Sequence, residues 1–190
     1  MITSAATVAE CRARLAELIR EHALRFGDFT LASGQKSTYF IDGKLVTLQA
    51  EGAYCLARCL LDMLQGREVD AVGGMAIGAD PITGAVVALA GAEGKPLIGF
   101  LVRKEQKDHG TRKQVEGPLP EGSRVVMLED VVTTGGSTLQ AIEAVEREKS
   151  VKVVGVLAMV DRLQGAKANL AARGYELQSV FEITELGVKL

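Results

Sequence analysis

The sequence predicts a single α/β domain whose central β-sheet is mainly parallel and is flanked by helices. Short apolar runs of strand length alternate along the chain with longer segments whose apolar residues recur at helical spacing. One run, residues 125–128, is continuously apolar and rich in β-branched residues, which is typical of a parallel strand buried on both faces. The 190 residues are enough for one domain with a substantial core, and they contain no internal repeat or linker.

Composition excludes several classes of function. The net charge of -2 provides no general positive field for binding nucleic acid or an anionic membrane. No apolar run approaches the roughly 18 to 20 residues of a membrane span, and the amino terminus lacks a signal-peptide pattern. We therefore expect a cytoplasmic protein with no nucleic-acid or membrane partner. Cys11, Cys55 and Cys59 lie in helical patterns and are interpreted as buried, reduced thiols.

The first third of the chain predicts a helix, a hairpin and a second helix. Thr7 and Glu10 form a capping box for a helix whose apolar stripe runs through residues 11–23. Residues 29–31 and 39–41 are strand-like and flank a turn rich in Ser and Gly, which by residue type is a plain surface hairpin. Residues 50–65 have a broad apolar helical face and end at Gly66.

The next segment contains two buried strands. Residues 69–72 predict a strand, residues 73–81 a glycine-rich turn, and residues 82–92 an apolar helix. Glycines allow close approach of a ligand, so this turn can present amides to a phosphate, although packing explains most of its residues equally well. Residues 96–102 predict the next strand.

Residues 103–118 are the most polar stretch of the chain. Residues 103–113 contain five Lys or Arg against Glu105 and Asp108, and Gly110 and Gly117 permit movement. A charge run of this kind is usually a solvated loop. Because it leaves the end of a core strand, where open α/β sheets bind ligands, we instead expect a lid whose cations neutralise a departing anion.

The sequence from Arg124 to Thr138 predicts a pocket for a sugar 5-phosphate. The strand at 125–128 is expected to stop at Glu129 and Asp130, and a small-residue loop follows whose amides can converge on an anion. Ser137 and Gln140 suggest a capping box for the next helix, whose N-terminus favours a phosphate. The two carboxylates suit sugar hydroxyls or a metal. An ordinary βα turn with a solvated acidic pair is the alternative.

The end of the chain adds one candidate anion-binding residue. Residues 151–160 form a long apolar run ending at Asp161 and Arg162. The guanidinium of Arg162 can bind a carboxylate through paired hydrogen bonds, and a surface salt bridge with Asp161 is the alternative. Residues 164–173 predict a helix that ends at Gly174, and residues 176–183 predict the last strand before a short polar end.

Three motifs, in order, resemble those of orotate phosphoribosyltransferases: FTLASGQKSTYFID, RKEQKDHG and LEDVVTTGGST. The resemblance spans nearly the whole chain. It implies the type I phosphoribosyltransferase fold with a small N-terminal hood, formed mainly by about residues 1–45, and a mobile catalytic loop at about 103–117. It further implies transfer of ribose 5-phosphate from phosphoribosyl pyrophosphate (PRPP) to orotate, giving orotidine 5'-monophosphate and pyrophosphate in de novo pyrimidine biosynthesis.

The resemblance also assigns site residues. Those implied to bind PRPP are Arg103, Lys104, Lys107, His109, Glu129, Asp130, Val131, Val132, Thr133, Thr134, Gly135, Gly136 and Ser137. Of these, Arg103, Lys104, Lys107, His109 and Asp130 are implied to be catalytic. Those implied to bind orotate are Phe40, Ile41, Thr133 and Arg162. Mg²⁺ is expected to arrive bound to PRPP, and a homodimer is implied in which the loop of one subunit reaches the site of the other.

The resemblance leaves some questions open. Ala32 and Gly78 stand where relatives carry Lys, and Lys36 is a conceivable substitute for the first. His109 can donate a proton or act only through its charge. A phosphoribosyltransferase for a purine or another base is an alternative function. A non-catalytic PRPP-sensing regulator is another, but it calls for a DNA-binding module, whereas the residues before 26 predict one helix.

Overall fold

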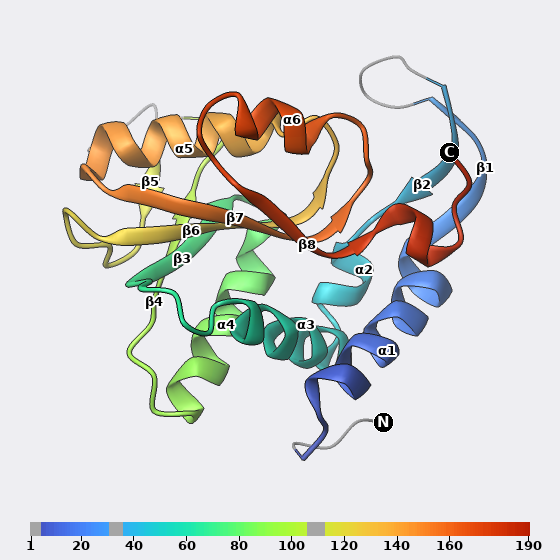
Figure 1. Ribbon diagram of the computed structural model, residues 1–190, viewed down its shortest axis with the longest axis horizontal. Coiled ribbons are helices and arrows are strands. Elements are labelled where there is room, and N and C mark those ends of the chain that lie inside the picture. Colours follow the sequence, from blue (N-terminus) through green and yellow to red (C-terminus); the bar gives the residue numbers. More distant parts are fainter. Residues whose placement is uncertain (1–4, 31–35, 106–112) are drawn as a thin grey trace.

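A computed structural model describes residues 5–30, 36–105 and 113–190 and shows helices on both faces of a six-stranded sheet (Figure 1). The helices are α1 Val8–Leu18, α2 Lys44–Thr47, α3 Ala50–Met63, α4 Ala79–Ala92, α5 Gly136–Lys149 and α6 Ala166–Ala171, with a π-helical turn η1 Ile19–Ala23 and a 3₁₀ turn η2 Ile183–Leu186. The strands are β1 Leu24–Thr30, β2 Lys36–Ile41, β3 Ala71–Met75, β4 Ile98–Val102, β5 Val115–Glu116, β6 Arg124–Val132, β7 Lys152–Asp161 and β8 Leu177–Glu182.

The main sheet confirms the predicted class. Its strand order is β5-β4-β3-β6-β7-β8, and every pair is parallel except β4 with the short edge strand β5. Helices α1, α3 and α4 cover one face, and α5 covers the other (Figure 1). This is the α/β architecture with a mainly parallel sheet, and it brings the carboxyl ends of β3, β4, β6 and β7 to one edge.

Burial on both faces explains the continuous apolar run of β6. Val126 and Leu128 pack with the core cluster under α1, α3 and α4, whereas Val125 and Met127 pack with the cluster under α5. Successive side chains of a strand point to opposite faces, so a strand between two helix layers needs apolar residues at every position. The same alternation decides where the following acidic residues point.

A separate two-stranded sheet, β1 with β2, lies beside the main sheet (Figure 1). The hairpin predicted from residues 29–31 and 39–41 is confirmed, but both strands begin earlier than predicted. The end of the chain lies close to η1, because Arg20 Nη2 donates a hydrogen bond to the Glu185 carbonyl at 2.8 Å. The 3₁₀ turn η2 contains the last residue of the predicted strand, Ile183, and the first three residues of the predicted polar end, and its Ile183 and Leu186 are buried.

The predicted boundaries around the first glycine-rich turn were wrong. β3 includes Gly73 and Gly74, and α4 begins at Ala79 rather than at residue 82. A β-carbon at Gly73 would lie 2.0 Å from the carbonyl oxygen of Phe100, and one at Gly74 would lie 2.1 Å from that of Leu128. These glycines therefore allow neighbouring strands to approach, and they do not form the turn.

Two further expectations were also corrected. The polar stretch after β4 includes β5, whose Val115 is buried, so part of the predicted loop is an edge strand. The capping box of Thr7 and Glu10 is confirmed, but that of Ser137 and Gln140 is wrong, because Gly135 is the N-cap of α5. Cys11, Cys55 and Cys59 are free and buried, as interpreted from the sequence.

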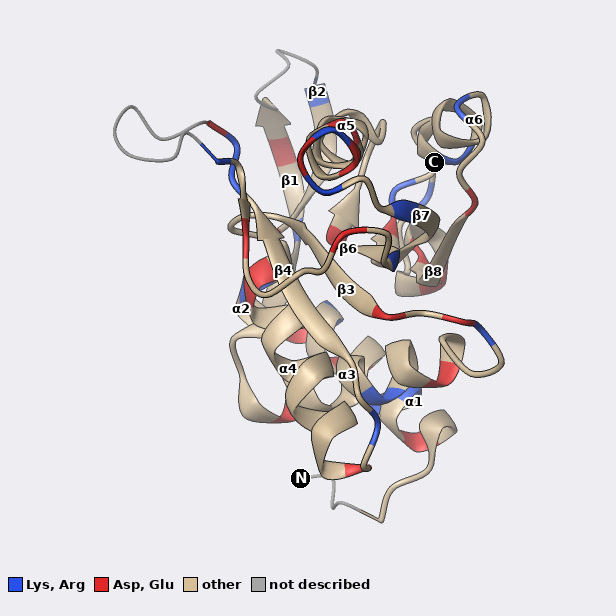
Figure 2. Ribbon diagram, turned by 90° about the vertical axis from the view of Figure 1, so that its left-hand side faces the viewer, with Lys and Arg blue, Asp and Glu red and all other residues tan. Residues whose placement is uncertain are grey.

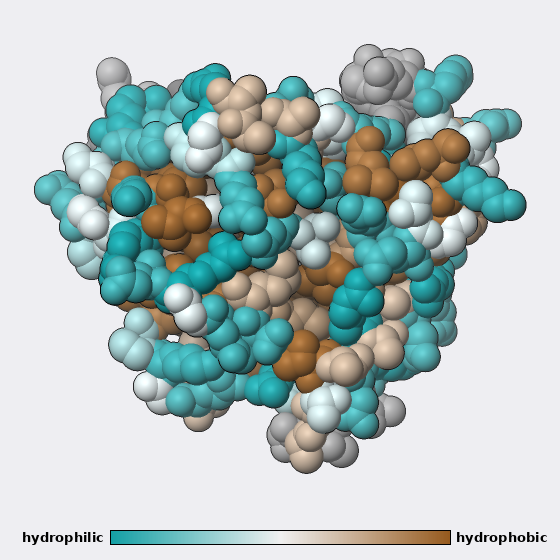
Figure 3. All heavy atoms as spheres, viewed as in Figure 1, coloured by the Kyte–Doolittle hydropathy of each residue, from teal (hydrophilic) through white to brown (hydrophobic). Residues whose placement is uncertain are grey.

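No helix of the described ranges combines the length and apolar character needed to cross a membrane. Hydrophobic side chains are visible on the face shown in Figure 3 only in separate patches among hydrophilic ones.

Candidate functional site

The predicted acidic pair lies within β6, near its carboxyl end, rather than after the strand. The strand continues to Val132, because Val131 and Val132 pair with Val160 and Asp161 of β7. Glu129 and Asp130 are consecutive strand residues, so their side chains point to opposite faces of the sheet. The pair therefore contributes one carboxyl group to each side of the same strand end.

Glu129 points toward the start of α5. Its Oε1 accepts a hydrogen bond from Thr138 Oγ1 at 2.8 Å, and Ser137 Oγ lies 3.5 Å away. Glu129 is only 6% exposed, and this burial raises the pKa of its carboxyl group to about 7. The Thr138 hydrogen bond opposes the rise, and the nearby Asp130 charge adds to it.

Asp130 points toward α2 and the start of α4. A β-carbon at Gly78 would lie 2.8 Å from Asp130 Oδ1, and one at Gly43 would lie 2.9 Å from Asp130 Cβ. Burial raises the pKa of Asp130, and the hydrogen bond from the Val131 amide and the charge of Lys44 oppose the rise. Two glycines from separate segments thus leave room for this carboxyl group.

The loop between β6 and α5 and the first turn of α5, residues 133–137, have the backbone geometry of an anion-binding site. We call these residues the anion cradle. Gly135 has a φ of +80°, a left-handed conformation that glycine adopts without strain, and it is the N-cap of α5. Within the described residues no side chain caps this helix, so the amides of its first turn and the positive end of its dipole face the loop. Asn169 Nδ2 donates a hydrogen bond to the carbonyl of Thr134 at 2.9 Å and holds the loop from α6.

Arg162 lies beside this cradle and is buried rather than at the surface. Its amide donates to the carbonyl of Val132 at 3.0 Å, and its Nε donates to the hydroxyl of Tyr39 at 3.0 Å. Its guanidinium carbon lies 4.7 Å from the centre of the Tyr39 ring. Among the described residues, the buried Nη2 of Arg162 has no hydrogen-bond partner. The alternative of a surface salt bridge with Asp161 is wrong, since Asp161 is buried and accepts from the Leu163 amide.

The two predicted hood residues differ in exposure. Phe40 is 43% exposed and its ring lies 5.7 Å from that of Phe29, whereas Ile41 is buried in the core. As neighbours in β2 they point to opposite faces of the hairpin. Ala32 lies outside the described residues, and Lys36 donates a hydrogen bond to Thr30 Oγ1.

The polar loop is described only at its two ends. Arg103 and Lys104 are exposed, and the amide of Arg103 donates to the carbonyl of Gln114 at 2.9 Å. The loop therefore leaves and re-enters the sheet edge at neighbouring points. Lys107 and His109 lie outside the described residues.

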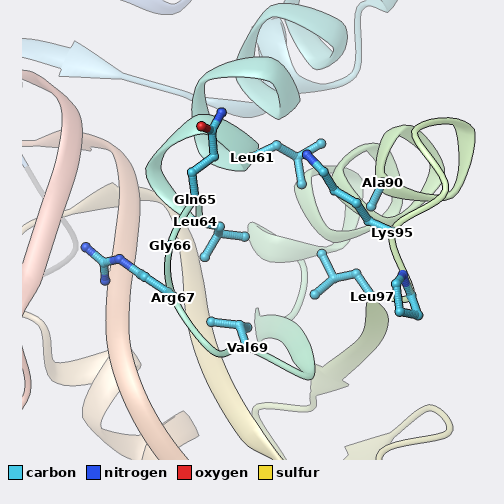
Figure 4. Close-up of a pocket in the computed structure, with 10 residues that line it drawn as sticks. Leu61, Leu64, Gln65, Gly66, Arg67, Val69, Ala90, Lys95 and Leu97 are labelled. Atoms are coloured by element: carbon cyan, nitrogen blue, oxygen red, sulfur yellow. The ribbon is translucent and has the colours of Figure 1, made fainter.

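A pocket of about 670 Å³ lies away from these residues (Figure 4). It is lined by the end of α3, the chain leading to β3, part of α4 and the chain leading to β4, and it includes Leu61, Leu64, Val69 and Leu97. These segments lie at the amino ends of the strands, opposite the edge that carries Asp130 and Arg162. We therefore place the candidate site at the edge that carries Asp130 and Arg162, and not in this pocket.

Sequence reasoning missed three contributors to this region. Asn169, Tyr39 and Lys44 act here through a hydrogen bond or a charge on a predicted residue. Thr138 was part of the predicted loop, but its hydrogen bond to Glu129 was not predicted. Tyr39 belongs to the quoted hood motif, so its position in that motif was an available signal. The others depend on packing between distant segments, which no local pattern reports.

Comparison with known proteins gives one consistent result. The family model described as "Phosphoribosyl transferase domain" matches residues 53–185. Orotate phosphoribosyltransferase of Rhodopirellula baltica is 46% identical over 183 residues, covering 93% of this chain and 94% of that protein. The enzyme of the same name from Synechocystis is 46% identical over 182 residues, covering 95% and 91%.

A solved structure agrees with these relatives. Mycobacterium tuberculosis orotate phosphoribosyltransferase in complex with PRPP matches with a TM-score of 0.78 and 34% identity, covering 94% of this chain and 99% of that one.

Proposed function

The chain belongs to the phosphoribosyl transferase domain family, and we propose that it is an orotate phosphoribosyltransferase of de novo pyrimidine biosynthesis. In this reaction the ribose 5-phosphate group of PRPP is transferred to orotate, which yields orotidine 5'-monophosphate and pyrophosphate. The alignments with these two relatives cover more than nine-tenths of this chain and of each relative, so the similarity is not confined to one segment.

The observation that best supports the proposal is the position of Arg162 beside the anion cradle. Its backbone hydrogen bond to Val132 places it next to the residues that precede Thr133, and its Nη2 has no partner among the described residues. A buried guanidinium with a free donor suits a carboxylate. Orotate carries a carboxylate, and PRPP carries the phosphate that suits the cradle.

Each predicted residue has a role in this proposal. The amides of Thr133 to Ser137 bind the 5-phosphate, and Val131 and Val132 lie against PRPP. Glu129 and Asp130 accept hydrogen bonds from the ribose hydroxyls. Arg162, Thr133 and the hood residues Phe40 and Ile41 hold orotate. Arg103, Lys104, Lys107 and His109 stabilise the negative charge that develops on pyrophosphate as its bond to the anomeric carbon breaks.

Magnesium fits the proposal as a partner of the substrate. The described residues contain no group of three or more His, Cys, Asp or Glu side chains that would form a metal cage. Mg²⁺ keeps much of its hydration shell and is bound largely through substrate phosphates, so we propose that it arrives bound to the diphosphate of PRPP. Bound there, the ion would neutralise charge on the diphosphate.

A homodimer with shared loops also belongs to the proposal. A hollow of about 510 Å³, lined mainly by small and apolar residues of α4 and β4, lies beside the start of the polar loop. Figure 2 shows α4 and β4 on this side with almost no charged residues. A second subunit docked there would lie next to Arg103, two residues beyond Leu101, so its site would be within reach of the loop.

The proposed domain organisation follows from the same roles. Residues 1–190 form one domain, and about residues 1–45 form the hood over orotate. Of the loop predicted at about 103–117, the part that precedes the edge strand β5 closes over PRPP. Closure excludes water that would hydrolyse PRPP. We propose a cytoplasmic location, which suits three free thiols.

Orotate consumption tests the proposed function. The ultraviolet absorbance of orotate should fall only when PRPP and Mg²⁺ are both present, and purine bases should not replace orotate. Consumption of a purine in its place would make the chain a phosphoribosyltransferase for another base. PRPP binding without turnover of any base would favour a regulator.

A further inference from the structure

We infer that Thr138 is a positioning residue for the sugar-phosphate site, because its hydroxyl holds the Glu129 carboxyl group against the start of α5. This inference rests on the proposed function and adds a residue beyond the loop at 131–137.

The geometry of the contact supports a specific role. Thr138 Oγ1 and Glu129 Oε1 are 2.8 Å apart, and the two residues are 1% and 6% exposed. A buried carboxyl group that loses its donor is left with an unsatisfied acceptor, which is costly away from bulk solvent. Ser137 Oγ, at 3.5 Å, is at the limit of a hydrogen bond, so Thr138 supplies the main contact.

Thr138 also connects the two elements that form the site. It is the third residue of α5, and Glu129 lies in β6, three residues before the strand ends at Val132. The hydrogen bond therefore closes the loop between them. Removing it should let the carboxyl group and the first turn of α5 move relative to each other.

The contact should also set the pH at which Glu129 ionises. Burial raises the pKa of Glu129 to about 7, and the neighbouring charge of Asp130 acts in the same direction. The facing residues of α5, Thr138 and Ser137, carry no charge and lower this pKa by donating hydrogen bonds. On the neighbouring strand β7, the residue paired with Glu129 is Ala158, which is uncharged. Loss of the Thr138 hydroxyl should therefore raise the pKa and leave less ionised Glu129 at neutral pH.

The test compares Thr138→Val, Thr138→Ser and Thr47→Val with the wild-type protein. Valine keeps the shape of threonine and removes the hydroxyl, and serine retains it. Thr47 is a matched control, since it is buried and, among the described residues, its hydroxyl has no partner. Thermal unfolding of each variant checks that it is folded.

We expect kcat/KM for PRPP to fall about tenfold at pH 7 in Thr138→Val, the loss of one hydrogen bond to a charged group. The acidic limb of its pH profile should move to higher pH. Thr138→Ser should restore most of kcat/KM and most of the wild-type position of the acidic limb. Thr47→Val should leave kcat/KM and the limb unchanged. Glu129→Gln should abolish the acidic limb. In the Glu129→Gln background, Thr138→Val should cause no pH shift.

Two outcomes distinguish the inference from the proposed function. An unchanged acidic limb in a folded, active Thr138→Val variant overturns the role of Thr138 and leaves the proposed function intact. A wild-type protein that does not convert orotate contradicts the proposed function. In that case PRPP binding, measured by calorimetry over the same pH range, still tests Thr138, and equal affinities of the wild type and Thr138→Val would overturn its role.

Discussion

At the scale of single residues, Arg162 is oriented by Tyr39 and still keeps a donor available. The Tyr39 hydroxyl accepts from Nε, and the Tyr39 ring lies beneath the guanidinium, so the side chain has little freedom to turn. This leaves Nη2 as the donor without a described partner. An arginine that is already oriented loses less entropy when it binds a carboxylate.

Arg162→Lys should therefore weaken orotate recognition. Lysine keeps the charge and loses the planar fork, so we expect kcat/KM for orotate to fall about 10-fold to 100-fold, the equivalent of roughly 1.5 to 3 kcal/mol. KM for PRPP should change less than about threefold. Steady-state kinetics with each substrate varied in turn measures both.

Arg12→Lys is the matched control for this substitution. Arg12 also lies over an aromatic ring, at 4.6 Å from the centre of Phe181, but it belongs to α1. Its replacement should leave both kinetic constants unchanged. A similar loss with both substrates in Arg162→Lys would contradict a specific role in binding orotate.

Gly78 has no space for a side chain beside Asp130. A β-carbon there would lie 2.8 Å from Asp130 Oδ1, which also accepts a hydrogen bond from the Val131 amide. Gly78→Ala should displace the carboxyl group and lower kcat/KM for PRPP about tenfold. This also explains why a lysine at this position would require Asp130 to move.

Gly91→Ala, in the helix that Gly78 precedes as N-cap, is the control. A β-carbon at Gly91 meets nothing within 4 Å, so alanine should raise the free energy of unfolding by about 0.5 to 1 kcal/mol and leave the kinetics unchanged. Normal PRPP kinetics in Gly78→Ala would show that the position of Asp130 is not critical.

At the scale of secondary-structure elements, β6 organises the molecule from both of its ends. Its carboxyl end carries Glu129, Asp130 and the cradle, and its amino end is held to β3 by Asp70 and Arg124. Asp70 Oδ2 accepts from the Arg124 amide at 2.8 Å, and Oδ1 accepts from Nη2 at 3.0 Å. These hydrogen bonds lower the pKa of Asp70 from its ordinary 3.8 to about 2.

Asp70 should consequently make stability depend on pH in the acid range. A carboxyl group whose pKa is lower in the folded state stabilises the protein above its unfolded pKa, and this contribution disappears as pH falls from about 4 to about 2. Asp70→Asn should lower the free energy of unfolding at pH 7 and should differ little from wild type near pH 2. Urea unfolding across this range measures the difference.

Asp28→Asn provides the comparison, since Asp28 is an exposed residue of β1. It should follow the wild-type curve at every pH. A constant difference between Asp70→Asn and wild type from pH 7 to pH 2 would mean that the ionised carboxylate is not what stabilises this contact.

At the scale of the whole molecule, the sheet edge that carries Asp130 and Arg162 and the mainly apolar side of α4 and β4 meet where the polar loop begins. The apolar character of α4 extends beyond the positions that the core buries, because its small residues Gly84 and Ala88 are exposed. An apolar side beside the proposed catalytic loop favours a second copy of the chain as its partner.

Ala88→Arg tests this side of the molecule. A charged side chain in an apolar interface should produce monomers, seen by light scattering, and should reduce turnover if the loop acts in the partner's site. Ala171→Arg, an exposed alanine of α6, should remain dimeric and active. Active Ala88→Arg monomers would contradict loop sharing, and a fully active Ala88→Arg dimer would place the interface elsewhere.

The sequence by itself determined the order of the longer strands and helices and the type of sheet, because apolar periodicity reports burial directly. It did not predict the short elements α2 and β5. It also indicated the chemistry of the edge, since an acidic pair, a Thr/Gly/Ser loop and Arg162 are local patterns. The exact ends of β3, β6 and α4 did not follow, because Gly73, Gly74 and Val131 are placed by pairing with neighbouring strands.

Only the tertiary structure decided how the site residues face one another. It turned Glu129 toward Thr138 and Asp130 toward Gly43 and Gly78, because strand alternation acts between two helix layers. It also buried Arg162 against Tyr39, a residue 123 positions away. Contacts between segments so far apart depend on packing, and a local pattern in the chain does not specify them.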